Sequence, residues 1–382
     1  VAAALGARRG VAALRARGAA GEEIALAAYG TSWRWSEAYE GGFSPADFSR
    51  VIASCPSDEW SFFDRGLRQI RGKYEWYCAT LGKYLESPRT TPLVVGGYSL
   101  PPSPFEAFET RVWAPGDFRR LVSFSEDFYP LSDSQCYVDF AADIIGGLFL
   151  FGRGLAEEEK MFLQLPELLL LVKERRQNDN PFYLSTPYHP TSRYNSDIVV
   201  FKNVTRPLRA IPKSVDVQCG WPPLSAAPCA EYAANQTTDR AFVTIIAANA
   251  QQFAFQKSGS KEGLYTKREF TFLARKIFAT FLAARDTGCP SLNSGYLGAG
   301  AFAGNRDLTV ALHALMAVGF DLPVKIWGAS PLSDDLTTMI SRIEQEATTF
   351  SAVFSKLRDA VFWGHGFRDK YVVDLKESAW MS

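Results

Sequence analysis

The sequence has little of what nucleic-acid-binding and metal-binding proteins depend on. Its 41 basic side chains are matched by 41 acidic ones, so it lacks the positive surplus that normally neutralises nucleic-acid phosphates. It has only three histidines, and its six cysteines form no closely spaced pairs of the kind that bind zinc. We therefore expect no direct DNA binding and no metal site, and no motif indicates a cofactor.

Long hydrophobic runs are missing as well. A membrane-spanning helix needs roughly 20 apolar residues, whereas the longest runs here, 144–151 and 168–172, have the length of buried strands. No transmembrane segment is therefore expected. The widely spaced cysteines favour buried or free thiols, which are typical of a reducing intracellular compartment such as the nucleus or cytoplasm.

The beginning of the chain has four arginines and no acidic residue before Glu22. This composition fits the end of a targeting sequence for a mitochondrion or plastid, but an ordinary alanine-rich helix has it too. Further along, Ser44 and Pro45 predict the N-cap and first position of a helix, and apolar residues recur at helical spacing over 57–85. Residues 1–90 are therefore predicted to form a helical N-terminal extension.

Hydrophobic residues make up 47% of the chain and aromatic residues 14%, which is enough for a sizeable core. Beyond the proline-rich segment 99–104, short apolar runs alternate with helical patterns, which predicts an α/β body over residues 91–335. Residues 336–382 are expected to form a C-terminal helix and tail packed on the body, and 181–228 long surface loops with one strand. The expected strands are 137–145, 167–172, 198–201, 242–247 and 324–327, and the expected helices are 157–163, 266–284 and 307–318.

Two glycine-containing segments are candidates for a site that binds an anion. In the first, the apolar run ending at Ile145 leads into Gly146 and Gly147 and then to three glutamates that open a helix. In the second, residues 293–305, four glycines precede the helical pattern that begins near Leu308. Small residues let backbone N–H groups approach a ligand, so a protein of neutral charge can hold a diphosphate. A plain glycine-rich turn would have the same composition.

Three consecutive glutamates, Glu157, Glu158 and Glu159, stand at the start of the helix after the first glycine segment. Acidic residues in a first helical turn interact favourably with the helix dipole, which explains them without any function. Consecutive residues of a helix project about 100° apart, so the three cannot share one solvent-facing side. One of them is expected to face the glycine loop, where a partly desolvated carboxylate beside a bound anion is suited to act as a general acid.

The order of these motifs resembles that of the poly(ADP-ribose) glycohydrolase family. The first glycine segment and its surroundings are similar to the signature region of that family, and the second resembles its second phosphate loop. The resemblance covers roughly residues 90–335. The segments that carry it are, in chain order, 138–141, 145–147, 158–159, 162–163, 166–168, 298–304 and 324–332.

The resemblance implies a macrodomain-like mixed sheet flanked by helices, and hydrolysis of ribose glycosidic bonds in ADP-ribose polymers or conjugates. Glu159 falls where the family has its catalytic glutamate, and Glu158 falls on the supporting neighbour. Glu159 would protonate the leaving ribose hydroxyl and then help to activate water. The implied ligand is ADP-ribose or poly(ADP-ribose), and the implied ligand-binding positions are Asp139, Gly146, Gly147, Glu157, Gly298, Gly300, Ala301, Phe302 and Gly304.

Several positions depart from the family pattern, among them three in its signature region. Leu148 stands where the family has a third glycine, Ala142 where an asparagine follows Asp-Phe-Ala, and Glu157 where a glutamine precedes the glutamate pair. Together they remove polar contacts and add bulk, and a single lost buried hydrogen bond costs about 1–3 kcal/mol. Two hypotheses follow. The chain is an active glycohydrolase, or it is a catalytically degenerate pseudoenzyme that serves as an ADP-ribose reader or as an accessory subunit with protein partners in a larger assembly.

Overall fold

The computed structural model describes the secondary structure of about two fifths of the chain, mainly within the predicted body. Statements about structure below refer to these residues. They are 15–17, 23–25, 33–39, 80–86, 91–100, 116–141, 145–146, 157–168, 196–210, 238–249, 267–299, 304 and 306–328, with single gaps at 82 and 128, and isolated positions at 105, 171, 184, 345, 349–352 and 354–355.

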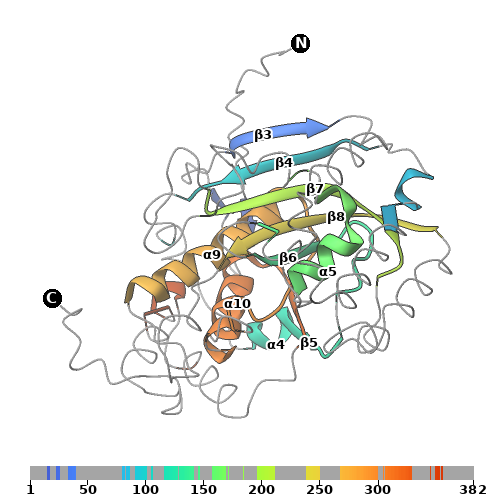
Figure 1. Ribbon diagram of the computed structural model, residues 1–382. Coiled ribbons are helices and arrows are strands. Elements are labelled where there is room, and N and C mark those ends of the chain that lie inside the picture. The colour runs from blue at the N-terminus through green and yellow to red at the C-terminus, as the bar shows by residue number, and fades with distance from the viewer. Residues whose placement is uncertain are drawn as a thin grey trace, which may run out of the picture.

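A mixed sheet of eight strands forms the centre of the described part of the molecule (Figure 1). The strands stand in the order β3-β4-β7-β8-β6-β9-β10-β5. Neighbours from β3 to β8 are antiparallel, whereas β8, β6, β9, β10 and β5 run parallel to one another, so their carboxyl ends lie along one edge. The bounds are β3 Trp33–Tyr39, β4 Leu93–Tyr98, β5 Val122–Ser125, β6 Cys136–Ala141, β7 Ile198–Leu208, β8 Thr238–Asn249, β9 Leu292–Ser294 and β10 Val324–Trp327.

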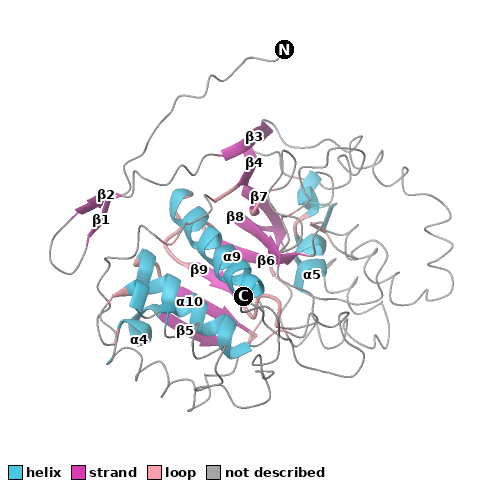
Figure 2. Cartoon of the chain, turned by 90° about the vertical axis from the view of Figure 1, so that its left-hand side faces the viewer, coloured by secondary structure: helices cyan, strands magenta, loops and turns pink. Residues whose placement is uncertain are grey.

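Helices cover both faces of this sheet. The long helices α9 (Lys267–Asp286) and α10 (Arg306–Phe320) lie on one face together with the short α4 (Asp117–Leu121). Helix α5 (Glu157–Gln164) lies on the other face, and Figure 2 shows the strands between the two groups. The α/β class with a mixed sheet flanked by helices, predicted from the sequence, is confirmed.

Alternation along β6 explains why both faces are covered. Successive side chains of a strand point to opposite sides. Cys136 and Val138 accordingly belong to the hydrophobic cluster built by α9 and α10, whereas Tyr137 and Ala141 belong to the cluster that includes Phe162 of α5. All four are at most 1% exposed. Burying a side chain of Val or Phe size stabilises the fold by about 1.5–3 kcal/mol, so β6 is held strongly from both sides.

Most of the expected elements of the body are found. The predicted strands 198–201, 242–247 and 324–327 lie within β7, β8 and β10, and the three predicted helices correspond to α5, α9 and α10. The strand predicted over 137–145 ends earlier, because β6 stops at Ala141 and a turn occupies residues 145–146.

One predicted strand, 167–172, is wrong. The described residues 166–168 and 171 are helical. Proline at position 166 has the fixed φ that suits the first position of a helix, and this local preference outweighs the apolar run that follows. The buried Glu167 is held by the hydroxyl of Tyr84, 2.8 Å from its Oε1, and by the backbone N–H of Thr205, 2.8 Å from its Oε2.

The first 90 residues are not wholly helical. Residues 15–17 (β1, Arg15–Arg17) pair with 23–25 (β2, Glu23–Ala25), and β3 extends the main sheet by pairing antiparallel with β4. Within β3, Trp33, Trp35 and Tyr39 recur at even spacing, which is a strand pattern with high β-propensity that the helical prediction overlooked. Residues 80–85 are helical, as predicted, apart from the gap at 82. The boundaries of the domains at 90 and 335 stay predictions.

A buried ion pair joins the start of β7 to α9. Asp197 Oδ2 accepts hydrogen bonds from Arg275 Nη2 at 2.7 Å and from the backbone N–H of Leu100 at 2.6 Å. The backbone carbonyl of Asp197 also accepts from the buried Lys276. Burial would raise the pKa of Asp197, but the Arg275 hydrogen bond and the Lys276 charge outweigh burial, so the pKa is below its ordinary value.

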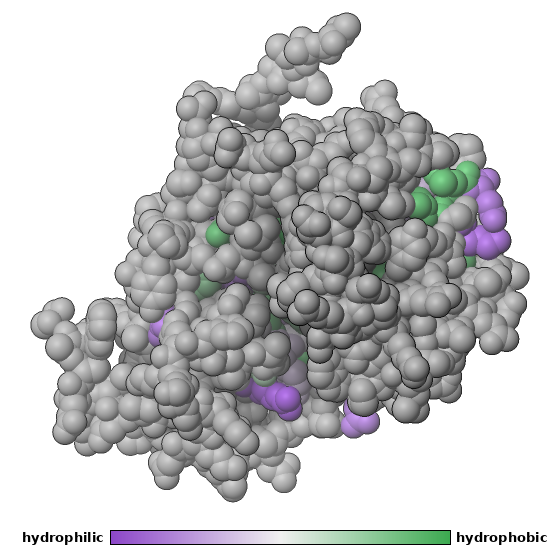
Figure 3. Space-filling view, viewed as in Figure 1, coloured by the Kyte–Doolittle hydropathy of each residue, from purple (hydrophilic) through white to green (hydrophobic). Residues whose placement is uncertain are grey.

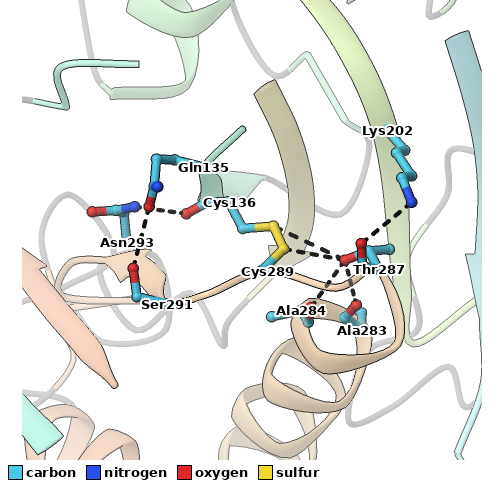
Figure 4. Close-up of a disulfide and its surroundings, with 9 residues drawn as sticks. All are labelled: Gln135, Cys136, Lys202, Ala283, Ala284, Thr287, Cys289, Ser291 and Asn293. Atoms are coloured by element: carbon cyan, nitrogen blue, oxygen red, sulfur yellow. Dashed lines mark hydrogen bonds between the residues drawn. A yellow bond between two sulfur atoms is a disulfide. The ribbon is translucent and has the colours of Figure 1, made fainter. Parts of the chain in front are cut away.

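A disulfide between Cys136 and Cys289 corrects the expectation of free thiols for these two residues (Figure 4). Their sequence separation is 153, yet their Cα atoms are 5.9 Å apart, because Cys136 begins β6 and Cys289 lies just before the neighbouring β9. The hydroxyl of Thr287 lies 3.2 Å from Sγ of Cys289 and donates to the Ala283 carbonyl at the end of α9. The other four cysteines lie outside the described residues.

Described apolar side chains are largely buried. Leu85, 37% exposed, is the exposed large hydrophobic residue among them. Figure 3 shows a small hydrophobic area beside a hydrophilic one at the upper right, where Figure 1 places the segment 80–86.

Near the C-terminal end, Phe350 is buried, and the centre of the Phe354 ring lies 4.8 Å from the centre of the Phe105 ring. No described helix is both long and apolar enough to cross a membrane.

Candidate functional site

The carboxyl ends of β6 and β9 define the position of the candidate site. These strands are parallel neighbours. The chain leaves β6 towards α5 on one face and leaves β9 towards α10 on the other face (Figure 2). Ligands of open α/β sheets bind in the crevice that forms where successive connections go to opposite faces. We call the connection 142–156 the first loop and the connection 295–305 the second loop.

A short hydrogen bond ties the first loop to α5. Gly146 has a φ of 92°, which favours glycine because other residues are strained there. Its buried backbone N–H donates to Glu158 Oε1 at 2.6 Å, and Glu158 is 5% exposed. Glu157 and Glu159 flank Glu158 in the first turn of the helix. The hydrogen bond therefore fixes this turn, with its three glutamates, beside the start of the first loop.

The second loop closes on itself near α10. The backbone N–H of Gly304 donates to the carbonyl of Gly298 at 2.9 Å, and Gly298 has a φ of 72°. At the start of the loop, Leu297 N–H donates to the Gly295 carbonyl at 3.1 Å, and Ala299 N–H donates to the Tyr296 carbonyl at 2.8 Å. The structure thus brings the predicted residues Gly298 and Gly304 together.

The beginning of the second loop packs directly on the end of β6. A Cβ atom added to Gly295 would lie 2.9 Å from two ring atoms of Phe140 and 3.2 Å from the carbonyl oxygen of Trp327. Such distances are too short for any larger residue unless its neighbours move. Gly295 therefore lets β6, β9 and β10 end close together, and this holds the starting points of the two loops side by side.

Two buried polar residues lie at the same edge on the face of α5. Asp139 is fully buried in β6, and alternation places it on the same face as Tyr137 and Ala141. In the parallel neighbour β8, Asn249 pairs with Ala141 and is 1% exposed. Asn249 was not singled out from the sequence. Its position at the end of a buried apolar run could have indicated it, because the ends of strands supply site residues in α/β sheets.

A buried histidine links α10 to the end of β9. His313 Nδ1 lies 2.7 Å from the carbonyl oxygen of Thr309, and Nε2 lies 2.7 Å from the hydroxyl oxygen of Ser294. The side chain of Thr309 in turn donates to the carbonyl of Leu297 at 3.3 Å. His313 is 1% exposed, and burial lowers its pKa to about 4, an effect that the hydrogen bond to Thr309 offsets only in part.

Charge at the second loop comes from one described arginine. The Arg306 guanidinium lies 5.2 Å from the centre of the Tyr296 ring, within the range of a cation–π contact. Arg306 is exposed and opens α10. Within the described residues, no group of three His, Cys, Asp or Glu side chains is placed to hold a metal ion.

The structure does not place every predicted site residue. The predicted residues Gly147, Gly300, Ala301 and Phe302 lie outside the described part of the chain, as do the departing positions Ala142 and Leu148. For Glu157 and Glu159 the backbone is described as helical.

Comparison with known proteins gives matches among solved structures alone. No model of a protein family matches the chain, and no curated protein does. Poly(ADP-ribose) glycohydrolase from Deinococcus radiodurans in complex with ADP-ribose is 15% identical, with 63% of this chain and 97% of that chain covered and a TM-score of 0.39. The glycohydrolase from Thermomonospora curvata is 14% identical, with 60% and 83% covered and a TM-score of 0.37. These structures belong to the family that the sequence motifs resemble. At 14% and 15% identity, the likeness does not assign roles to the site residues of this chain.

Proposed function

We propose that this chain is a glycohydrolase that cleaves ribose glycosidic bonds in poly(ADP-ribose) or in other ADP-ribose conjugates. The observation that supports it is the 2.6 Å hydrogen bond from Gly146 N–H to Glu158. It fixes the turn that carries Glu159 next to the first loop, at the edge where α/β sheets bind ligands. The two neighbouring residues then have different tasks: Glu158 holds the backbone, and Glu159 is assigned the chemistry.

In the proposed reaction, Glu159 protonates the ribose oxygen that leaves the anomeric carbon. The carboxylate so formed then accepts a proton from water as the water oxygen bonds to that carbon, so the products are an alcohol on the leaving ribose and a hemiacetal at the anomeric carbon, and the glutamic acid is restored. The transition state has oxocarbenium character. Gly146 and Gly147 would pass close to the ribose, and Asp139 and Asn249 would supply polar contacts on the face of α5.

The diphosphate is assigned to the second loop. Backbone N–H groups near a helix N-terminus bind anions without lysine, and the loop leads directly into α10. Gly298, Gly300 and Gly304, with Ala301 and Phe302 between the last two, would allow a close approach of backbone to phosphate. The Arg306 guanidinium would add a positive charge at the entrance.

The decisive experiment is hydrolysis of purified poly(ADP-ribose), followed as release of ADP-ribose. The unmodified chain is expected to release it, and Glu159→Gln is expected to lower the rate at least about 100-fold while the protein stays folded. Glu86→Gln is the matched control, because Glu86 is an exposed glutamate, far from Glu159 in the sequence, whose carboxylate pairs with Lys83. If the unmodified chain releases no ADP-ribose, the proposed glycohydrolase activity is refuted.

The departures at Ala142, Leu148 and Glu157 favour a second candidate function, an ADP-ribose reader or accessory subunit without activity. Calorimetry with ADP-ribose separates the two forms: binding without hydrolysis indicates the reader, and no binding indicates the subunit. The double variant Leu148→Gly with Ala142→Asn tests the cause. Activity that arises only in this variant would show that these two positions had closed the site.

A further inference from the structure

The strand that leads into the second loop is short. β9 has three residues, all buried, and lies between β6 and β10. Beyond Ser294 the chain leaves the sheet, so sheet hydrogen bonds no longer fix the direction of the second loop. Its position must come from contacts with the elements beside it. Among the described residues, Thr309 and His313 of α10 contact this part of the chain through hydrogen bonds, and Arg306 contacts the ring of Tyr296.

The geometry around His313 determines which atoms carry protons. The carbonyl oxygen of Thr309 can only accept, so His313 Nδ1, 2.7 Å away, must be the protonated nitrogen. Burial keeps the ring neutral near pH 7, so His313 Nε2 is an acceptor there, and the hydroxyl of Ser294 donates to it at 2.7 Å. Neutral imidazole with its proton on Nδ1 therefore satisfies both partners at once, whereas imidazolium would reverse the second bond, with the Ser294 oxygen accepting from Nε2–H.

Thr309 and His313 lie four residues apart and so share one face of α10. Through this face the helix holds the chain at two points: His313 holds Ser294, and Thr309 Oγ1 holds the carbonyl of Leu297 at 3.3 Å. These points precede Gly298, whose carbonyl accepts from Gly304. The ring of Phe281, 6.1 Å from the His313 ring, packs against the imidazole from α9.

We propose that His313 is a positioning residue for the second loop: by accepting from Ser294 it fixes the path on which Gly298 and the following backbone N–H groups meet the phosphates of the ligand. The inference rests on the proposed function for the identity of the ligand. The hydrogen bonds that join Ser294 to His313 and Leu297 to Thr309, which we call the clamp, need no ligand. The inference can therefore be tested with and without a ligand.

The ligand-free test is hydrogen exchange in the full chain, read on the peptide that covers residues 294–304. In His313→Leu, which has neither donor nor acceptor, exchange of this peptide is expected to speed up about tenfold or more, because the loop opens locally. In His313→Gln, which keeps one donor and one acceptor, it is expected to stay within about threefold of the unmodified chain. Met316→Ala is the matched control, because Met316 is buried in the same helix and faces the core.

Fast exchange in His313→Leu with normal exchange in Met316→Ala and His313→Gln supports the clamp. Equal protection in all variants, or equal loss in His313→Leu and Met316→Ala, overturns it, because the effect of His313 would then be absent or merely structural. Titration with ADP-ribose adds the second readout: His313→Leu should raise Kd and KM about tenfold and change kcat little. If the unmodified chain binds no ADP-ribose, the proposed function fails, while the exchange result still decides the clamp.

Discussion

Glu158 shows, at the scale of a single residue, that a carboxylate in the candidate site can hold the backbone in place. It is 5% exposed and accepts from the buried N–H of Gly146 at 2.6 Å. A charged acceptor makes a stronger hydrogen bond than a neutral one, and a buried N–H without any acceptor is costly. The acidic run was predicted as a site or as a helix-dipole feature, and this hydrogen bond gives its middle member a structural task as well.

Glu158→Ala is expected to lower the free energy of unfolding by about 1–3 kcal/mol, because it leaves the N–H of Gly146 without its acceptor. Glu158→Gln keeps an acceptor oxygen and should cost less than about 1 kcal/mol. Urea denaturation of both variants measures the difference. Equal losses would mean that the negative charge, and not the acceptor, is what matters.

His313 predicts a pH dependence of stability. Its pKa is about 4 in the folded protein, below the ordinary value of 6.5, because burial disfavours the charged ring. The unfolded chain therefore binds the proton more tightly, and acidification favours unfolding. The contribution of neutral His313 is fully present above pH 6.5, is lost progressively as the pH falls to about 4, and amounts to about 3 kcal/mol.

The measurement is the free energy of unfolding of the unmodified chain and of His313→Gln between pH 4 and pH 7. Subtracting the two curves removes the titration of all other groups. The stability of the unmodified chain should fall more steeply with acidification than that of the variant. Parallel curves would contradict the buried, neutral state of the imidazole.

At the scale of the element, α9 depends on a buried charge pair with the segment before β7. The Asp197 side chain is 2% exposed and that of Arg275 17%. Because the pKa of Asp197 is lowered, its contribution to stability is present above the ordinary carboxyl range and is lost as the pH falls through the lowered value.

Asp197→Asn should lower the free energy of unfolding by about 3–5 kcal/mol at neutral pH, because it leaves the Arg275 charge buried without its partner. Arg120→Ala provides the matched control: Arg120 is 59% exposed in its pair with Asp321, and exposed pairs contribute at most about 1 kcal/mol. Thermal unfolding of both variants checks the order. A larger loss in Arg120→Ala would refute this account of α9.

The sequence predicted the elements whose pattern is long and regular. α9 and α10 show helical periodicity over 20 and 15 residues, and β7 and β8 contain continuous apolar runs. β9 has three residues and β5 four, too few for any periodicity, and their pairing depends on partners far along the chain. The predictions for 167–172 and 33–39 are of the wrong type, because Pro166 favours the start of a helix and the alternating aromatic residues of β3 favour a strand.

For the site, the sequence indicated the glycines and glutamates because small and acidic residues stand out in a row. It did not indicate His313, Asn249 or the role of Gly295. Their importance comes from neighbours in space: Ser294 for the histidine, Ala141 for the asparagine and Phe140 for the glycine. No spacing rule connects positions that meet only when β6, β8 and β9 lie side by side.

At the scale of the whole molecule, the Cys136–Cys289 disulfide joins positions separated by 153 residues. A crosslink over a long loop restricts the unfolded chain and stabilises the fold by about 2–5 kcal/mol. We therefore expect reductant to lower the Tm of the unmodified chain and to leave the Tm of Cys289→Ser unchanged.

Mass spectrometry of peptides prepared without reductant identifies the crosslink directly, as a pair of peptides that contain Cys136 and Cys289. A Tm that does not respond to reductant, together with separate alkylated peptides, would contradict the disulfide. The hydrogen bond from Asn293 to the Cys136 carbonyl, at 3.0 Å, ties the same two strands without sulfur. β6 and β9 should accordingly remain paired in the reduced chain.

The pairing of β5 with β10 has a consequence for the newly made protein. Val122 and Phe124 of β5 pair with Val324 and Ile326, about 200 residues later in the chain. At about 5–20 residues per second, the ribosome needs about 10–40 s to produce this partner. During that interval an apolar strand edge is available to other chains, so we expect the protein to engage chaperones while it is being synthesised.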